Sequence, residues 1–301
     1  MRRALTILTV AFIAVLSPAQ AQERLTVVAT FSILGDFAKN VGGDRVSVTT
    51  LVGANSDTHV YTPTPSDAKK ITDAKLVIVN GLGLEGWLPR LVKSSGGKAA
   101  TVIATKGIAP RKIEAGEALS QDHDLGSADP HAWQSVVNAK IYVANIRDAL
   151  IAADPAGADA YKANATTYLS KLDTLDQEVR EAMAKIPPER RSVISTHDAF
   201  GYFAAAYGVR FIAPQGVSTE SEPSARDIAA IITQIKKQKI PAVFLENVSD
   251  PRLMQRIASE TGARIGGTLY SDSLTDEKGP APTYIDMVRH NIKALTSALS
   301  S

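Results

Sequence analysis

The 301-residue sequence contains no cysteine, only 6% aromatic residues, and almost no excess of either charge. Without cysteine, a disulfide framework, a thiolate metal site and a thioether-linked lipid are all excluded. Beyond residue 21, no apolar run reaches the roughly 20 residues that a membrane-spanning helix needs. The fold must therefore be stabilised by its core alone, and any metal site must use imidazole and carboxylate groups.

The first 21 residues have the three parts of a secretory signal. Arg2 and Arg3 precede an apolar segment over residues 4–16, and Ala19-Gln20-Ala21 fits a small-residue cleavage site. The apolar segment is too short to span a bilayer in the mature protein. We expect cleavage after Ala21 and a soluble, periplasmic protein that is not membrane-anchored.

The mature chain would carry no net charge. Loss of Arg2 and Arg3 lowers the count of lysine and arginine from 33 to 31, which equals the 31 aspartate and glutamate residues. An electrically balanced chain argues against nucleic acid or an anionic membrane as the main partner. Its length is sufficient for one large domain or two medium ones.

Short runs rich in β-branched residues alternate with helical patterns in both halves of the chain. The alternation indicates an α/β fold with mostly parallel sheets covered by helices. Ser66 is the expected N-cap of a helix over 65–74, and Asp129 with Pro130 is expected to start a helix that runs to about residue 152. The predicted strands are 25–30, 46–52, 75–81 and 99–105 in the first half, and 192–196, 210–214, 242–247 and 263–270 in the second.

One long helix is predicted between the two halves. From about residue 156, apolar residues recur at spacings of 3, 4 and 7 until Pro187 and Pro188 end the helix. At 1.5 Å per residue, about 30 residues make a helix of about 45 Å, longer than a single domain needs. We therefore expect a signal peptide (1–21), an N-terminal β/α lobe (22–155), a connecting helix (156–187) and a C-terminal β/α lobe (188–301).

Four side chains that could bind a ligand lie at strand ends or helix starts: His59, His131, His197 and Asp272. In open α/β sheets, ligands bind beyond the carboxyl ends of the strands, so two candidates in each half predict a site between the lobes. Three imidazoles and one carboxylate suit a tetrahedral divalent ion such as zinc. No local motif such as H-E-x-x-H supports this, and a surface or capping role remains open for each histidine.

Three further residues are interpreted separately. Glu246 follows a buried-looking strand and is expected either to accept a hydrogen bond from a metal ligand or to form a structural ion pair. His123 lies between two aspartates in the polar segment 114–128, either as a surface residue or as an aid to metal capture. His290 lies in a helix among basic neighbours and is expected to face solvent.

Four blocks of the sequence resemble the metal-binding receptors of zinc and manganese ABC importers. The blocks are "TLVGANSDTHVYTPTPSDAKKITDAKLVIVNGLGLEGWL", "DPHAWQSVVNAKIYVANI", "STHDAFGYFAAAYGV" and "FLENVSDPRLMQRIASETGARIGGTLYSDSL". The resemblance implies two Rossmann-like lobes, a long rigid connecting helix and one metal ion in the inter-lobe cleft. It also implies a non-catalytic receptor, expected to be a monomer, that delivers its ion to a membrane permease.

The resemblance places the metal ligands on His59, His131, His197 and Asp272. Receptors for manganese or iron usually carry glutamate at the third position, so His197 favours zinc. Manganese, or both metals, remains the alternative. The chain departs from enterobacterial zinc receptors because it lacks a disulfide and has only "QDHD" (121–124) in place of a long histidine-rich loop.

Three other functions remain open on the residues alone. A secreted zinc hydrolase would need an open fourth coordination position and a general base, for which Glu246 is the candidate. A surface adhesin would need a means of attachment that a chain without cysteine lacks. A receptor for an organic anion would need arginine beside the candidate ligands, and none of the four blocks provides it.

Overall fold

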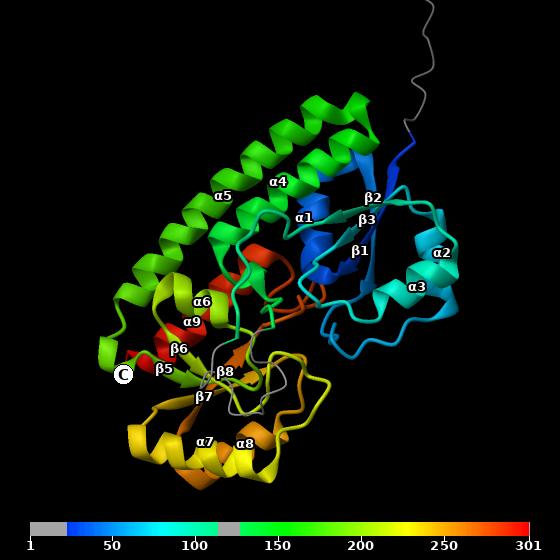
Figure 1. Ribbon diagram of the computed structural model, residues 1–301. Coiled ribbons are helices and arrows are strands. Elements are labelled where there is room, and N and C mark those ends of the chain that lie inside the picture. Colours follow the sequence, from blue (N-terminus) through cyan, green and yellow to red (C-terminus); the bar gives the residue numbers. More distant parts are fainter. Residues whose placement is uncertain (1–22, 114–126, 301) are drawn as a thin grey trace, which may run out of the picture.

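The computed structural model describes residues 23–113 and 127–300, and it divides into two lobes with the same sheet topology (Figure 1). The predicted signal peptide and His123 lie outside the described residues. Each sheet has four parallel strands, in the order β2-β1-β3-β4 in the N-terminal lobe and β6-β5-β7-β8 in the C-terminal lobe. The strands are β1 (Leu25–Phe31), β2 (Val46–Val52), β3 (Leu76–Val79), β4 (Ala100–Ile103), β5 (Ser192–Ile194), β6 (Arg210–Ile212), β7 (Ala242–Glu246) and β8 (Arg264–Leu269). All eight predicted strands are confirmed, several at shorter bounds.

Helices cover both faces of each sheet. In the N-terminal lobe, α1 (Ser32–Gly42) and α4 (Val136–Ala153) lie on one face, and α2 (Pro65–Asp73) and α3 (Leu88–Ser95) on the other. In the C-terminal lobe, α6 (Gly201–Tyr207) and α9 (Tyr284–Leu299) lie on the face toward α5 (Ala158–Ala184), while α7 (Ala225–Gln238) and α8 (Arg252–Thr261) lie on the outer face. Of the helices in the described ranges, none is long and apolar enough to cross a membrane.

Helix α5 (Ala158–Ala184) is the long helix that joins the lobes (Figure 1). Its 27 residues extend over roughly 40 Å. It contacts α1 and α4 on the N-terminal side and α6 and α9 on the C-terminal side. It is shorter than the predicted 156–187, because 3-10 turns at Pro155–Gly157 and Pro188–Arg190 flank it.

A single apolar cluster runs through both lobes. It joins the inner faces of the two sheets to α1, α4, α5 and α9, without a break at the lobe boundary. Asp36 on α1 links three of these helices, because its Oδ2 accepts hydrogen bonds from the Tyr284 backbone N–H (3.1 Å) and the Tyr168 hydroxyl (3.2 Å). The start, middle and end of the chain therefore share one core.

The structure corrects two local predictions and adds one helix that the sequence did not indicate. The N-cap of α2 is Thr64 and not Ser66: Thr64 forms a capping box with Asp67, and Pro65 takes the first helical position. The helix expected from Pro130 begins only at Val136, after a 3-10 turn over Ala132–Gln134. Helix α3 was not predicted, because eight residues after a glycine-rich segment are too few to establish a helical period.

Candidate metal centre

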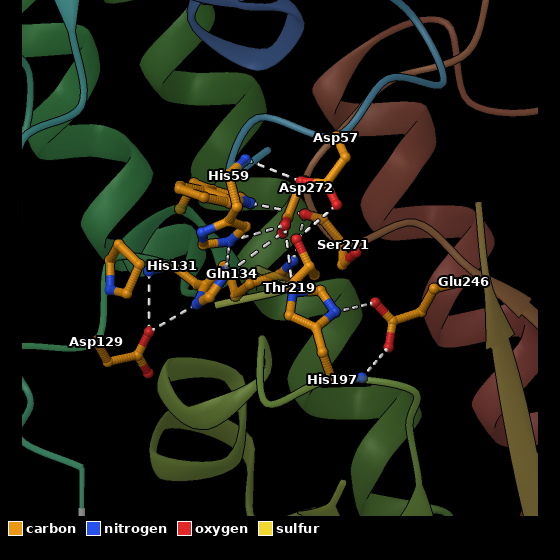
Figure 2. A network of polar contacts seen from close by, with 12 residues as sticks. Asp57, His59, Asp129, His131, Gln134, His197, Thr219, Glu246, Ser271 and Asp272 are labelled. Atoms are coloured by element: carbon orange, nitrogen blue, oxygen red, sulfur yellow. Dashed lines mark hydrogen bonds and ion pairs between the residues drawn. The ribbon is translucent and has the colours of Figure 1, made fainter. Parts of the chain in front are cut away.

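The structure brings the four predicted ligands together between the lobes (Figure 2). His59 lies in the loop between β2 and α2, and His131 in the turn before the 3-10 segment Ala132–Gln134. His197 follows β5, and Asp272 follows β8. One nitrogen or oxygen atom from each of the four lies within 4.8 Å of the other three. The carboxyl ends of two parallel sheets thus converge on one point, as the fold class requires.

The distances among these atoms fit a single small cation. Asp272 lies 3.3 Å from His59 Nε2, 3.2 Å from His197 Nε2 and 3.6 Å from His131 Nε2. The Nε2 atoms of His59 and His131 are 3.2 Å apart. Two ligand atoms that are each about 2.0–2.1 Å from a tetrahedral zinc ion lie roughly 3.3 Å from each other. These four distances are close to those expected within a coordination shell.

The cluster is buried, and its carboxylate lies against the rings of the three histidines. His131, His197 and Asp272 have no exposed surface, and His59 is 8% exposed. Neither oxygen of Asp272 accepts a hydrogen bond from the described residues. Burial alone would raise the pKa of Asp272, but the adjacent His197 and His131 hold it well below its ordinary value. In the metal-free protein the charges of His131 and His197 offset the cost of burying this carboxylate, and a bound cation would take over that role.

Two of the histidine rings are oriented by carboxylates on their outer side (Figure 2). His131 Nδ1 lies 2.9 Å from Asp129 Oδ1. His197 Nδ1 lies 2.5 Å from Glu246 Oε2, as an ion-pair contact and not an aligned hydrogen bond. A carboxylate that holds Nδ1–H leaves the lone pair of Nε2 facing the centre of the cluster, which is the arrangement of metal-binding histidines. Glu246 thus contacts both the ring and the backbone N–H of His197.

The backbone N–H of all three histidines is bound by a carboxylate. Asp57 accepts from His59 (2.8 Å), Asp129 from His131 (2.9 Å), and Glu246 from His197 (3.0 Å). Sequence reasoning missed Asp57 and assigned Asp129 to a helix cap. The signal that could have identified them is the repeated pattern Asp-x-His, in "DTH" and "DPH".

Two of the imidazoles, those of His131 and His197, have raised pKa values in the metal-free protein. Burial alone would lower the pKa of His131, but the negative charges of Asp272 and Asp129 outweigh this effect and raise it to about 9. Burial likewise opposes protonation of His197, yet Glu246 and Asp272 raise its pKa well above the ordinary value. A metal ion must therefore displace protons from the rings when it binds.

A second set of contacts joins the lobes directly behind the cluster. Trp133 Nε1 (2.8 Å) and Gln134 Nε2 (2.7 Å) both donate to the Ser271 carbonyl oxygen. The donors lie two and three residues after His131, and Ser271 directly precedes Asp272. The two ligands are thereby held in a fixed relation, although they come from different lobes.

One prediction about the remaining histidines is wrong. His290 does not face solvent: its Nε2 lies 3.0 Å from the Thr268 carbonyl oxygen, and its ring packs edge-on against Tyr270. It is a half-buried structural residue of α9 and has no contact with the metal cluster.

Comparison with known proteins identifies relatives that are described as metal-binding proteins, in agreement with the clustered side chains. A family model described as the periplasmic component A of a zinc-uptake complex matches residues 27–298. Iron-binding protein YfeA of Yersinia pestis is 36% identical over 290 residues, covering 96% of this chain and 91% of that protein. Manganese-binding lipoprotein MntA of Halalkalibacterium halodurans is 36% identical over 278 residues, covering 92% and 89%.

A solved structure shares the whole fold. The periplasmic zinc-binding protein TroA of Treponema pallidum superposes with a TM-score of 0.84 at 31% identity, covering 93% of this chain and 100% of that one. The chain belongs to the family of periplasmic metal-binding receptors of ABC importers. Members of this family are substrate-binding proteins and not enzymes, which confirms the non-catalytic prediction and sets aside the hydrolase.

Proposed function

We propose that this receptor carries Zn²⁺ through the periplasm on His59, His131, His197 and Asp272 and delivers it to a membrane permease. The contacts of 3.2–3.6 Å between Asp272 and the three Nε2 atoms support the ligand set most directly. Three imidazoles make the site rich in nitrogen, which suits zinc better than an ion that prefers oxygen ligands. Four protein ligands also close the tetrahedron, leaving no position for an activated water.

Manganese is the second candidate, because of how Asp272 is oriented. Its Oδ1 lies toward His131 and its Oδ2 toward His59 and His197, so both oxygens face the centre. A carboxylate that binds through both oxygens gives five ligand atoms, and added oxygen coordination favours manganese. The relatives named for iron and manganese point the same way.

A competition titration separates the two metals. Chelator-stripped protein is titrated with Zn²⁺ and Mn²⁺ at equal buffered free concentrations, and bound metal is counted by elemental analysis. We expect one ion per chain and preferential uptake of zinc. His197→Ala should lose zinc binding, and His197→Glu should retain one ion but shift the preference toward manganese. Preferential uptake of manganese by the unmodified chain would overturn the zinc assignment, and normal zinc binding by His197→Ala would overturn the ligand set.

The carrier is further proposed to act as a monomer with an N-terminal lobe (22–155), a connecting segment (156–187) and a C-terminal lobe (188–301). Residues 1–21 would direct export and be removed after Ala21. The chain has no cysteine to which a lipid could be attached, unlike the relative that is named a lipoprotein. The apolar cluster shared by both lobes opposes wide hinge opening, so release is proposed to require local movement of the loops that carry the ligands.

A further inference from the structure

His59 differs from the other three ligands in its exposure and in how it is held. It borders an open groove of about 830 Å³, together with Tyr61, Trp87, Arg90 and Glu220. The other three ligands have no exposed surface. No carboxylate in the described part of the chain contacts Nδ1 of His59, whereas Asp129 and Glu246 contact Nδ1 of His131 and His197. His59 is thus the ligand nearest to solvent and the one whose ring is least oriented from behind.

Asp57, the carboxylate associated with His59, instead binds the opposite lobe (Figure 2). Its Oδ1 accepts the His59 backbone N–H at 2.8 Å, and its Oδ2 accepts the Thr219 hydroxyl at 2.6 Å. Thr219 lies in the segment between β6 and α7. In that segment, the Gln215 side chain donates to the carbonyls of Thr219 (3.1 Å) and Ser221 (2.9 Å), and Gln215 pairs with the backbone of His197. One side chain therefore connects the His59 turn to the segment that is anchored beside His197.

The neighbouring contacts restrict which part of this loop can move. On one side, the backbone N–H of Asn55 donates to the Leu274 carbonyl (2.9 Å), and that of Ser56 to the Ser273 hydroxyl (3.3 Å). On the other side, the Tyr61 hydroxyl donates to Asp67 (2.8 Å) within the N-terminal lobe. His59 lies in the short stretch between these anchors, and Asp57 makes the last contact with the C-terminal lobe before it.

We propose that the Asp57–Thr219 hydrogen bond is an inter-lobe latch that sets the rate at which the metal ion leaves through the groove beside His59. Asp57 and Thr219 are positioning residues, because neither touches the ion. When the latch is closed, the His59 backbone is held against the C-terminal lobe and Nε2 stays in the cluster. When it opens, His59 can turn toward the groove while Trp133 and Gln134 still hold His131 and Asp272 together. The proposal rests on the ligand set proposed above.

The test measures zinc dissociation from Thr219→Val, which removes the hydroxyl at nearly constant volume. Protein loaded with one Zn²⁺ is mixed with excess chromophoric chelator in a stopped-flow instrument. We expect the dissociation rate to rise about tenfold, the scale of one lost hydrogen bond to a charged group. The association rate should rise by a similar factor, because the latch is also closed in the metal-free protein, so the zinc affinity should change little. Thr219→Ser should restore the original rate.

Ser218→Ala is the matched control. Ser218 lies in the same segment as Thr219, but its hydroxyl oxygen accepts a hydrogen bond from the Glu220 backbone N–H, which belongs to that segment and not to the opposite lobe. Its dissociation rate should equal that of the unmodified protein. An unchanged rate in Thr219→Val, an equal rise in Ser218→Ala, or no restoration by Thr219→Ser would each overturn the latch. Failure of the unmodified chain to bind one zinc ion would instead overturn the proposed function, so the two failures are distinguishable.

Discussion

The two lobes have the same strand order but use their buried glutamates differently. In the C-terminal lobe, Glu246 accepts the backbone N–H groups of Thr196 (2.7 Å) and His197 (3.0 Å) and also contacts the His197 ring. In the N-terminal lobe, Glu85 accepts the backbone N–H groups of Asn80 (2.6 Å) and Gly81 (3.1 Å) and the Thr30 hydroxyl (2.7 Å). Both carboxylates fasten a strand end, yet only Glu246 also orients a ligand.

The difference shows that two lobes with the same sheet topology can orient their histidines by different contacts. The C-terminal lobe orients His197 from within itself. The N-terminal lobe orients His131 through Asp129 in the same turn, and leaves His59 dependent on Asp57 and its contact with Thr219 across the cleft. We therefore expect the affinity for metal to depend on the buried carboxylates, and the rate of release to depend on the latch.

The largest effect should come from pH, because protons compete with the metal ion for one histidine ring in each lobe. Both His131 and His197 have raised pKa values in the metal-free protein, about 9 for His131. Metal affinity should fall by about tenfold per pH unit for each proton displaced. Affinity measured from pH 8 to pH 6, with proton release counted by calorimetry in buffers of different ionisation enthalpy, checks this. A constant affinity would show that the rings are already neutral.

Protonation of His131 should have the opposite effect on the stability of the metal-free protein: its unfolding free energy should fall as the pH rises, whereas the metal affinity should increase. The folded-state pKa of His131, about 9, exceeds its ordinary value of 6.5. The stabilisation from protonated His131 is therefore fully present below pH 6.5 and is lost as the pH rises through 9. Chemical denaturation of metal-free protein across this range measures it, with an Asp129→Asn variant expected to show a shallower decline.

The next largest effect should come from the paired variants Glu246→Gln and Glu85→Gln. Glu246→Gln removes the charge behind His197 and should weaken metal binding by roughly 10–100-fold, as is usual for partners of ligating histidines. Glu85→Gln places an amide donor against backbone donors and should destabilise the fold by roughly 1–3 kcal/mol, with little change in affinity. Chelator competition measures the metal affinity of each variant, and denaturant unfolding measures its unfolding free energy. Equal losses of affinity would refute the distinction between the lobes.

The smallest effect should come from the two capping boxes, which occur at corresponding places in the lobes. Thr64 with Asp67 caps α2, and Ser224 with Asp227 caps α7. Thr64→Ala and Ser224→Ala should each cost about 1 kcal/mol of unfolding free energy. Metal affinity should be unchanged in both. A loss of affinity in Thr64→Ala alone would mean that this cap also holds the His59 loop in place.

Local patterns predicted the strands and made the four clustered residues candidates, but the resemblance of the four sequence blocks was needed to select them as a set. All eight strands are short β-branched runs, and His59, His131, His197 and Asp272 were candidates because strand ends in parallel sheets converge. The half-buried position of His290 could not be read from its helix, because its neighbours Thr268 and Tyr270 belong to another element. Likewise, Thr219 is 162 residues from Asp57, and no sequence period encodes that contact.

The hydrogen bond from the Tyr284 backbone to Asp36 has a consequence for the synthesis of the chain. Helix α1 follows the first strand, but α9, which carries Tyr284, is the last helix of the described chain. The polypeptide is made from its N-terminus, so α1 cannot complete its contacts until nearly the whole chain has been synthesised. The N-terminal lobe thus reaches its final packing only after the last helix has docked.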